Sequence, residues 1–305
     1  MNKDSIANIS LSVLIFLILY GVLRKCESDA ETKSITKFEI APTYILPSIK
    51  VPDKVTFAGE PVPLDEPDVW ERLDRELHVN TFWHSNTIFL LKRGNKWLSK
   101  IEKVLTENGI PPDLKYLAVI ESDLTNAVSP SEAVGFWQLL KGTATDFGLE
   151  VDNEVDERYN PEKSTEAAAD YLKKAHEKFG TWTNAAASYN IGMRGLQREF
   201  DEQKVDSYYD LLLNEETSRY VFRAIAVKLI FENPEKFGFN LEPDQLYKTQ
   251  KLKEVEVDET IDNLRDFSFD QGINYKILKR YNPWLRKNKL TLRNGKKYVI
   301  LIPEN

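Results

Sequence analysis

The chain has 305 residues, 42% hydrophobic and 29% charged, which is enough for one sizeable core and a smaller module. A formal net charge of −7 argues against a nucleic-acid partner, and the single cysteine excludes a disulfide within the chain. The three histidines, at positions 78, 84 and 176, lack the spacing of metal ligands, and no glycine-rich phosphate loop occurs, so we expect neither a metal nor a cofactor.

An apolar run lies near the N-terminus. It is unbroken from Val13 to Leu23 and weaker from Ile6, which gives about 18 residues, just enough to span a bilayer. This pattern predicts a signal anchor or a secretory signal peptide over residues 1–25. Cys26 follows the run, but Lys25 stands where a lipoprotein signal needs a small residue, so we do not expect a lipid anchor.

Residues 26–67 are polar, contain six prolines and show little helical periodicity. This composition predicts an extended linker that holds a folded domain away from the N-terminal segment.

Helical periodicity begins after the linker. Asp68 is predicted to cap a helix in which Trp70, Leu73 and Leu77 share a face. Further helical patterns follow, so we expect a mainly α domain over residues 68–240.

Glu121 continues the apolar stripe of one of these helices. Pro111-Pro112 suits a first helical turn, and Leu114, Leu117 and Ala118 recur at helical spacing before the glutamate. The side chain should therefore point inward. A carboxyl group in a dry interior keeps its proton to higher pH and can act as a general acid. The alternative is a buried glutamate paired with an Arg or Lys for structural reasons.

The C-terminal residues 246–305 have a different pattern. Strands are predicted at 251–257 and 298–302, with short helices at 260–267 and 275–281 between them, which gives a small β-α-α-β module. The stretch Lys276 to Lys297 holds nine Lys or Arg and no acid. This charge either binds an anionic partner or forms a solvated face.

A series of motifs runs between residues 109 and 232. It comprises Glu121-Ser122, Ser129-Pro130, Gly135-Phe136-Trp137-Gln138, Asp156-x-Arg158-Tyr159-Asn160-Pro161, Phe179-Gly180-x-Trp182, Ala187-Ser188-Tyr189-Asn190-x-Gly192 and Glu216-Thr217-x-x-Tyr220-Val221. Their order and spacing resemble the soluble lytic transglycosylase family of peptidoglycan-cleaving enzymes, and most closely its membrane-bound murein transglycosylase D branch. The resemblance implies a mainly α, lysozyme-like fold of the goose type.

The resemblance also implies a reaction. In that family, the glutamate matching Glu121 protonates the glycosidic oxygen between MurNAc and GlcNAc. As a carboxylate it then takes a proton from the C6 hydroxyl of the same MurNAc, which leaves a 1,6-anhydro ring. The positions that match substrate-binding residues of the family are Ser122, Ser129, Gln138, Tyr189, Asn190, Glu216 and Tyr220.

Glu132 departs from the family pattern, because many members carry glycine there. The motif therefore does not predict the shape of the loop around Glu132. Trp137 and Trp182 fit either the core or a platform for a sugar ring.

The C-terminal module resembles the peptidoglycan-binding LysM family, in a degenerate form. Val257-Asp258-Glu259-Thr260-Ile261 is similar to the Gly-Asp-Thr-Leu turn of that family, and Tyr281-Asn282-Pro283 to the asparagine after its second helix. On this reading, the basic stretch contacts stem-peptide carboxylates or lipid head groups.

These resemblances predict an enzyme that acts on peptidoglycan strands at the periplasmic face of a bacterial membrane. The N-terminal segment would anchor it there, or it would be secreted if that segment is cleaved. We expect no nucleic acid and no obligate protein partner. Two alternatives stay open: a muramidase resembling goose-type lysozyme, in which water attacks, and a non-catalytic wall-binding scaffold.

Overall fold

The computed structural model describes residue 20, residues 48–293 and residues 295–304. The predicted anchor or signal peptide, apart from Tyr20, and the predicted linker up to residue 47 lie outside the described residues. Within the described ranges, no helix combines the length and the apolar character needed to cross a membrane.

The mainly helical domain that was predicted over residues 68–240 is present, and it begins at residue 49. Its elements are β1 (Thr56–Phe57), β2 (Glu60–Pro61), α2 (Pro67–Phe82), α3 (His84–Glu107), η1 (Pro112–Leu114), α4 (Lys115–Ser122), α5 (Lys141–Asp146), η2 (Glu157–Tyr159), α6 (Pro161–Phe179), α7 (Trp182–Ile191), α8 (Met193–Gln203), η3 (Tyr208–Asp210), α9 (Glu215–Glu232) and η4 (Pro234–Phe237).

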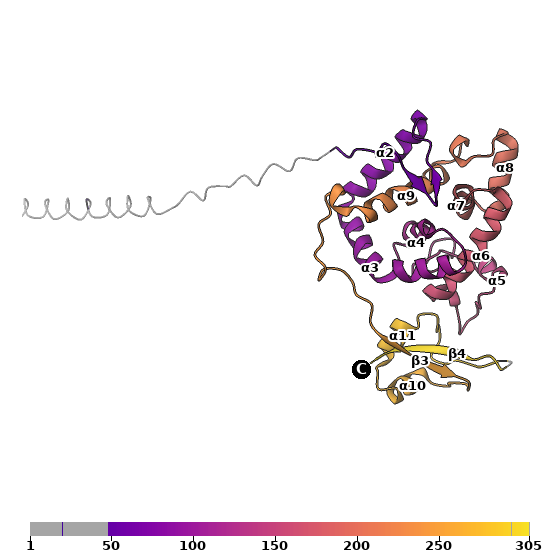
Figure 1. The fold of residues 1–305 in the computed structure, drawn as a ribbon. Helices are drawn as coiled ribbons and strands as arrows, with labels where there is room; N and C mark the ends of the chain where they lie inside the picture. The colour runs from indigo at the N-terminus through magenta and orange to yellow at the C-terminus, as the bar shows by residue number, and fades with distance from the viewer. Residues whose placement is uncertain (1–19, 21–47, 294, 305) are drawn as a thin grey trace, which may run out of the picture. The chain divides into compact units, whose positions relative to one another are not determined.

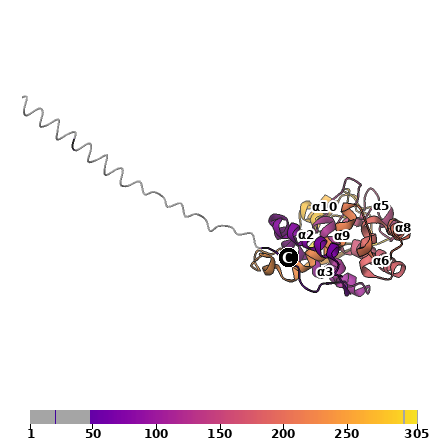
Figure 2. The same cartoon turned by 90° about the horizontal axis from the view of Figure 1, so that it is seen from above.

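The short helix α4 lies in the middle of this domain, enclosed by the longer helices (Figure 1). It packs along α9 and against α3, and Tyr116 to Ile120 are all buried. Helices α2 and α9 lie side by side in both views (Figures 1 and 2). Ala185 to Ala187 of α7 are fully buried, and these small side chains allow α7 to approach α6 and α9 closely. The core thus holds α4 from several sides.

Residues 49–64 do not form the extended linker predicted up to Pro67. Phe57 is fully buried, Val51 and Val55 are nearly so, and β1 pairs with β2 in a small hairpin. Glu60 accepts hydrogen bonds from the backbone N–H groups of Trp182 and Thr183, at 2.6 and 2.9 Å. The segment folds because its apolar residues and one carboxylate find partners on distant helices, and no local periodicity signals this.

Helix α2 begins at Pro67, with Glu66 rather than Asp68 in the capping position. Val69, Leu73 and Leu77 form its buried stripe, whereas Trp70 is 43% exposed. The predicted face was therefore wrong at Trp70, because Val69 lies four residues before Leu73 and takes the inward position.

The C-terminal module has the predicted β-α-α-β order, with β3 (Leu252–Val257), α10 (Leu264–Asp270), α11 (Tyr275–Tyr281) and β4 (Tyr298–Pro303). The strands pair antiparallel over their full lengths. Helix α10 starts later than predicted, because Asn263 caps it by accepting a hydrogen bond from the N–H of Arg265. Ile261, which was placed in this helix, pairs instead with Leu290.

A loop of the helical domain, residues 150–157, packs against this module. Val155 joins the hydrophobic core of the module and forms a β-bridge with Leu285. On either side of it, the N–H of Asp156 donates to the carbonyl of Trp284 at 2.9 Å, and the N–H of Arg286 donates to the carbonyl of Glu154 at 2.7 Å. The module is therefore attached by backbone pairing and apolar burial together.

Part of the basic stretch faces this loop. Lys289 pairs with Glu154 at 2.8 Å, Arg293 with Asp152 at 3.7 Å, and Lys296 with Glu150. The Lys289 ammonium and the N–H of Thr291 hold the pKa of Glu154 down to about 2. These three cations thus neutralise carboxylates of the same chain, a use that neither sequence interpretation included.

Replacing Glu154 by Gln should loosen this attachment. The variant loses the charge-assisted contact to Lys289, and we expect a loss of about 1 kcal/mol in the free energy of unfolding at neutral pH, since the pair is partly screened by solvent. Because the pKa of Glu154 is depressed, its contribution is present above about pH 4.5 and disappears as the pH falls toward about 2. Thermal unfolding of the full chain at several pH values measures both effects.

Glu256→Gln is the matched control, because Glu256 pairs with Lys297 inside the module and both side chains are more than half exposed. Such a pair contributes little. Equal melting temperatures for the two variants would contradict the role given to Glu154.

Candidate active site

Glu121 is the second-last residue of α4 and lines a cavity of about 780 Å³. The cavity is lined from α2, α3, α4 and α9, together with residues just after α4. Helix α4 stops there because Asp123 and Leu124 adopt left-handed φ angles of 53° and 55°. Two consecutive non-glycine residues in this region are strained, and such strain is typical of functional sites. The turn leaves the carboxyl group at a helix end, facing open space.

Burial raises the pKa of Glu121 from 4.5 to about 7. The side chain is half-buried and the protein around it supplies little solvation for a charge. The hydroxyl of Tyr220 donates a hydrogen bond to Oε1 at 2.6 Å, and Arg223 lies close enough to act through its charge; both favour the carboxylate and limit the rise. The group therefore exchanges its proton near neutral pH, as a general acid requires.

The alternative of a structural ion pair does not apply. Arg223 donates from Nη2 to the backbone carbonyl of Ile120 at 2.9 Å, and no Lys or Arg of the described chain forms an ion pair with Glu121. Its only hydrogen-bonding side chain among the described residues is Tyr220, which is itself buried on α9. Oε2 remains available to a ligand.

Glu216 and Asn190 meet at the edge of the cavity. Glu216 is exposed in the first turn of α9, and the side-chain amide of Asn190 lies 3.5 Å from its Oε1. The Glu216 charge adds to the rise in the pKa of Glu121. A second carboxylate thus lines the same cavity.

Three of the predicted substrate residues shape the loop after α4. The Ser122 hydroxyl donates to the carbonyl of Phe136 at 2.9 Å, and Ser129 Oγ accepts from the N–H of Ala133 at 3.0 Å. The Gln138 side-chain amide donates to the carbonyls of Gly135 and Ala127. Ser122 also lines the cavity, whereas Ser129 and Gln138 do not.

Tyr189 lies behind the acid rather than on the cavity wall. Its hydroxyl donates to the carbonyl of Trp137 at 2.8 Å, and its ring packs edge-on against Trp137 and Tyr171. Burial, followed by the charge of Glu121, raises the pKa of Tyr189 well above its ordinary value. Tyr189 is half-buried, packs against the core and does not line the cavity.

The loop keeps a glycine-like shape at Glu132. This residue has a φ of 61°, the left-handed region that a glycine would adopt without strain, and its carbonyl accepts from Arg158 at 3.1 Å. At Gly135, a Cβ would approach the carbonyl oxygen of Arg158 to 2.0 Å, so only glycine fits. The departure at Glu132 therefore leaves the backbone turn in place.

Trp83 is a cavity residue that the sequence interpretation missed. It joins α2 to α3, is 60% exposed and lines the cavity beside Asn80 and Asn86. An exposed indole between amides is a typical surface for a sugar ring. Trp137, by contrast, is fully buried with its Nε1–H bonded to Thr165 Oγ1 at 2.8 Å, and so belongs to the core.

Arg219 and Arg223 were also missed, although they follow Glu216 and Tyr220 at helical spacing along α9. Arg219 pairs with the buried Glu76 of α2 at 2.6 Å, which ties α2 to α9 beside the cavity. The periodicity of α9 was the signal that would have found both arginines.

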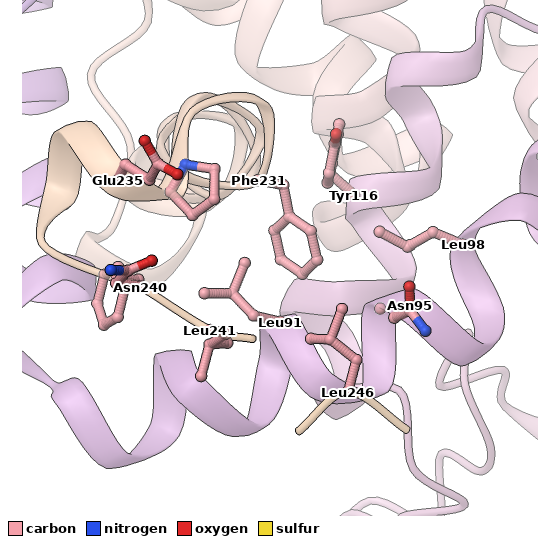
Figure 3. Close-up of a pocket in the computed structure, with 12 residues that line it drawn as sticks. Leu91, Asn95, Leu98, Tyr116, Phe231, Glu235, Asn240, Leu241 and Leu246 are labelled. Atoms are coloured by element: carbon pink, nitrogen blue, oxygen red, sulfur yellow. The ribbon is translucent and has the colours of Figure 1, made fainter. Parts of the chain in front are cut away.

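A second cavity, of about 370 Å³, lies elsewhere in the helical domain (Figure 3). The figure shows leucine and aromatic side chains around it, among them Leu91, Leu98 and Phe231. Its one carboxylate, Glu235, is exposed. This cavity lacks a half-buried acid, so the Glu121 cavity is the better candidate for chemistry. Across the described residues, no group of His, Cys, Asp and Glu is arranged to hold a metal ion.

Comparison with known proteins gives two matches within this chain. Residues 100–211 match the transglycosylase SLT domain, and residues 253–305 match the soluble lytic transglycosylase C-terminal LysM-like domain. The chain is also 24% identical over 258 residues to the membrane-bound lytic murein transglycosylase D of Escherichia coli strain K12, and equally to that of Escherichia coli O6:H1. The alignment covers 82% of this chain and 55% of each relative, so the chain spans about half the length of the curated relatives it matches. Both resemblances seen in the sequence are confirmed.

Replacing Glu121 by Gln should stabilise the protein at high pH. The folded-state pKa is raised, so the folded protein binds the proton more tightly than the unfolded chain, and stability falls as the pH rises from 4.5 through about 7. The variant avoids this loss and should be more stable by up to about 3 kcal/mol above pH 8, with little difference at pH 4.5.

Urea unfolding of both proteins across this pH range measures the difference. Glu216→Gln is the control: it removes only the smallest contribution to the raised pKa of Glu121 and should show a much weaker trend. A difference in unfolding free energy between Glu121→Gln and wild type that does not change with pH would contradict the raised pKa.

Proposed function

We propose that this chain, which carries an SLT transglycosylase domain and a LysM-like domain and is a distant homologue of membrane-bound lytic murein transglycosylase D, is a peptidoglycan lytic transglycosylase. It cleaves the β-1,4 bond between MurNAc and GlcNAc and leaves a 1,6-anhydroMurNAc end. The observation that carries the proposal is the half-buried Glu121 carboxyl in an open cavity, with its pKa raised to about 7.

One carboxyl group suffices for both steps of this reaction. Glu121 gives its proton to the glycosidic oxygen as the bond from C1 to that oxygen breaks, and GlcNAc leaves as an alcohol. The Glu121 carboxylate then removes the proton of the C6 hydroxyl, whose oxygen bonds to C1 of the same MurNAc. The proton returns to Glu121 and no water is consumed. A pKa near the working pH serves the acid and the base equally well.

The surrounding residues orient the Glu121 carboxyl group and bind the sugar. Tyr220 holds Oε1, which leaves Oε2 to deliver and recover the proton, and its hydrogen bond stabilises the carboxylate between the two steps. Trp83 supplies a stacking surface for a sugar ring, and Asn80 and Asn86 supply amides for sugar hydroxyls. The LysM-like module would keep the domain on its polymer, at the bacterial cell envelope.

A muramidase is the second candidate, because Glu216 lines the same cavity. A hydrolytic enzyme uses a second carboxylate to activate water or to stabilise the sugar cation. Glu216 is exposed, and its Oε1 lies 3.5 Å from the side-chain amide of Asn190. This environment suits a binding role better than the role of an activated base.

Mass spectrometry of digested peptidoglycan separates these candidates. We expect muropeptides that weigh one water less than hydrolysed ones, because the 1,6-anhydro ring replaces the added water. Glu121→Gln should reduce cleavage by roughly 10³-fold or more, since the general acid is lost. Glu216→Gln should still form anhydro products, at a reduced rate.

Hydrolysed ends that disappear in Glu216→Gln would establish the muramidase instead. If wild type and Glu121→Gln clear peptidoglycan equally slowly while both bind it, the protein is a scaffold and the catalytic proposal fails.

A further inference from the structure

A third cavity, of about 280 Å³, lies where the helical domain meets the C-terminal module. Helix α3 and the start of α6 form one side, and the end of α11 with the residues after it forms the other. Trp97, Tyr281 and Trp284 give it aromatic walls, so a flat or aliphatic group can lie against it. Neither the SLT match nor the LysM-like match assigns a function to this junction.

The rim of this cavity is cationic. Lys96, Lys100, Lys103 and Arg280 line it, and they face only two carboxylates, Glu107 and Glu162. Glu107 is already paired with Lys103 at 3.8 Å. Among the described residues no carboxylate forms an ion pair with Lys96, Lys100 or Arg280. Arg280 differs in this from Lys289 and Lys296, which belong to the same basic stretch and are paired.

These cations are held together at an electrostatic cost. Burial, and then the charges of Arg280 and Lys100, lower the pKa of Lys96. The ammonium of Lys96 also lies over the ring of Trp97 at 4.6 Å, which fixes it at the rim. An anion bound here would relieve the repulsion between three cations from two parts of the fold.

The segment after Glu121 lies between this cavity and the Glu121 cavity. Thr125 and Ala127 line the Glu121 cavity, whereas Asn126 between them lines the junction cavity. The two cavities therefore lie on either side of the backbone of residues 125–127. A branch of a ligand bound near Glu121 would have to pass around this segment to enter the junction cavity.

We propose that the junction cavity binds the carboxylate-bearing peptide stem of the peptidoglycan strand whose glycan occupies the Glu121 cavity. The proposal rests on the proposed function for the identity of the substrate. The stem branches from the lactyl group of MurNAc and carries several free carboxylates on a short aliphatic chain. That combination matches three unpaired cations above an aromatic wall, whereas a bare glycan strand offers one carboxylate for each MurNAc.

Two readouts on the full chain test this assignment. The first is calorimetric titration with the free stem tripeptide L-Ala–γ-D-Glu–meso-diaminopimelate. The second is kcat/KM for glycan strands that retain their stems and for strands from which an amidase has removed them. The test variant combines Lys100→Ala and Arg280→Ala, both exposed positions, so the fold should be retained and thermal unfolding checks this.

Wild type should bind the tripeptide, and the double variant should bind it about tenfold more weakly or worse, since two charge-assisted contacts are lost. The variant should lose kcat/KM on stem-bearing strands through KM, and match wild type on stripped strands. Lys276→Ala is the control, because Lys276 is exposed on the same helix as Arg280 and does not line the cavity.

Absence of tripeptide binding by wild type would overturn the assignment. An equal loss on stripped strands would overturn it as well, because the cations would then contact the glycan itself. If wild type cleaves neither kind of strand, the proposed function fails, and the titration alone decides whether the cavity takes the peptide.

Discussion

The hydrogen bond between Tyr220 and Glu121 is the contact on which the rest of the site depends. Burial alone would raise the pKa of Glu121 further and leave an acid that rarely gives up its proton. The 2.6 Å hydrogen bond and the charge of Arg223 favour the carboxylate and bring the pKa to about 7. Both partners come from α9, so the close packing of α4 along α9 sets the acidity as well as the stability of the domain.

The cavity is open because the backbone after α4 turns away sharply. Asp123 and Leu124 occupy the left-handed region, which is unfavourable for residues with a Cβ, and the surrounding contacts hold them there. Ser122 anchors the following loop to Phe136, and Gly135 lets that loop touch the backbone of Arg158. The loop in turn separates the Glu121 cavity from the junction with the C-terminal module.

The sequence predicted what depends on local periodicity and on motif order. The inward position of Glu121 followed from its spacing after Leu114 and Leu117, and the β-α-α-β order of the module followed from its alternating strands. Residues 49–64 were placed in a linker, because their apolar residues show no period and pair with distant helices. Trp83 carried no motif, and its exposure beside the acid depends on how α2 meets α3. The basic stretch could not be interpreted from composition, because its carboxylate partners lie in the loop 150–157.

The proposed mechanism requires the Glu121 carboxyl to hold a proton near neutral pH. The side-chain carboxyl carbon of Glu121 can be followed directly by ¹³C NMR of protein labelled with ¹³C-glutamate. Its signal is assigned by its absence in Glu121→Gln. We expect a titration midpoint near pH 7. A midpoint near 4.5, the ordinary value for glutamate, would show that the group is already ionised at neutral pH and cannot serve as the general acid.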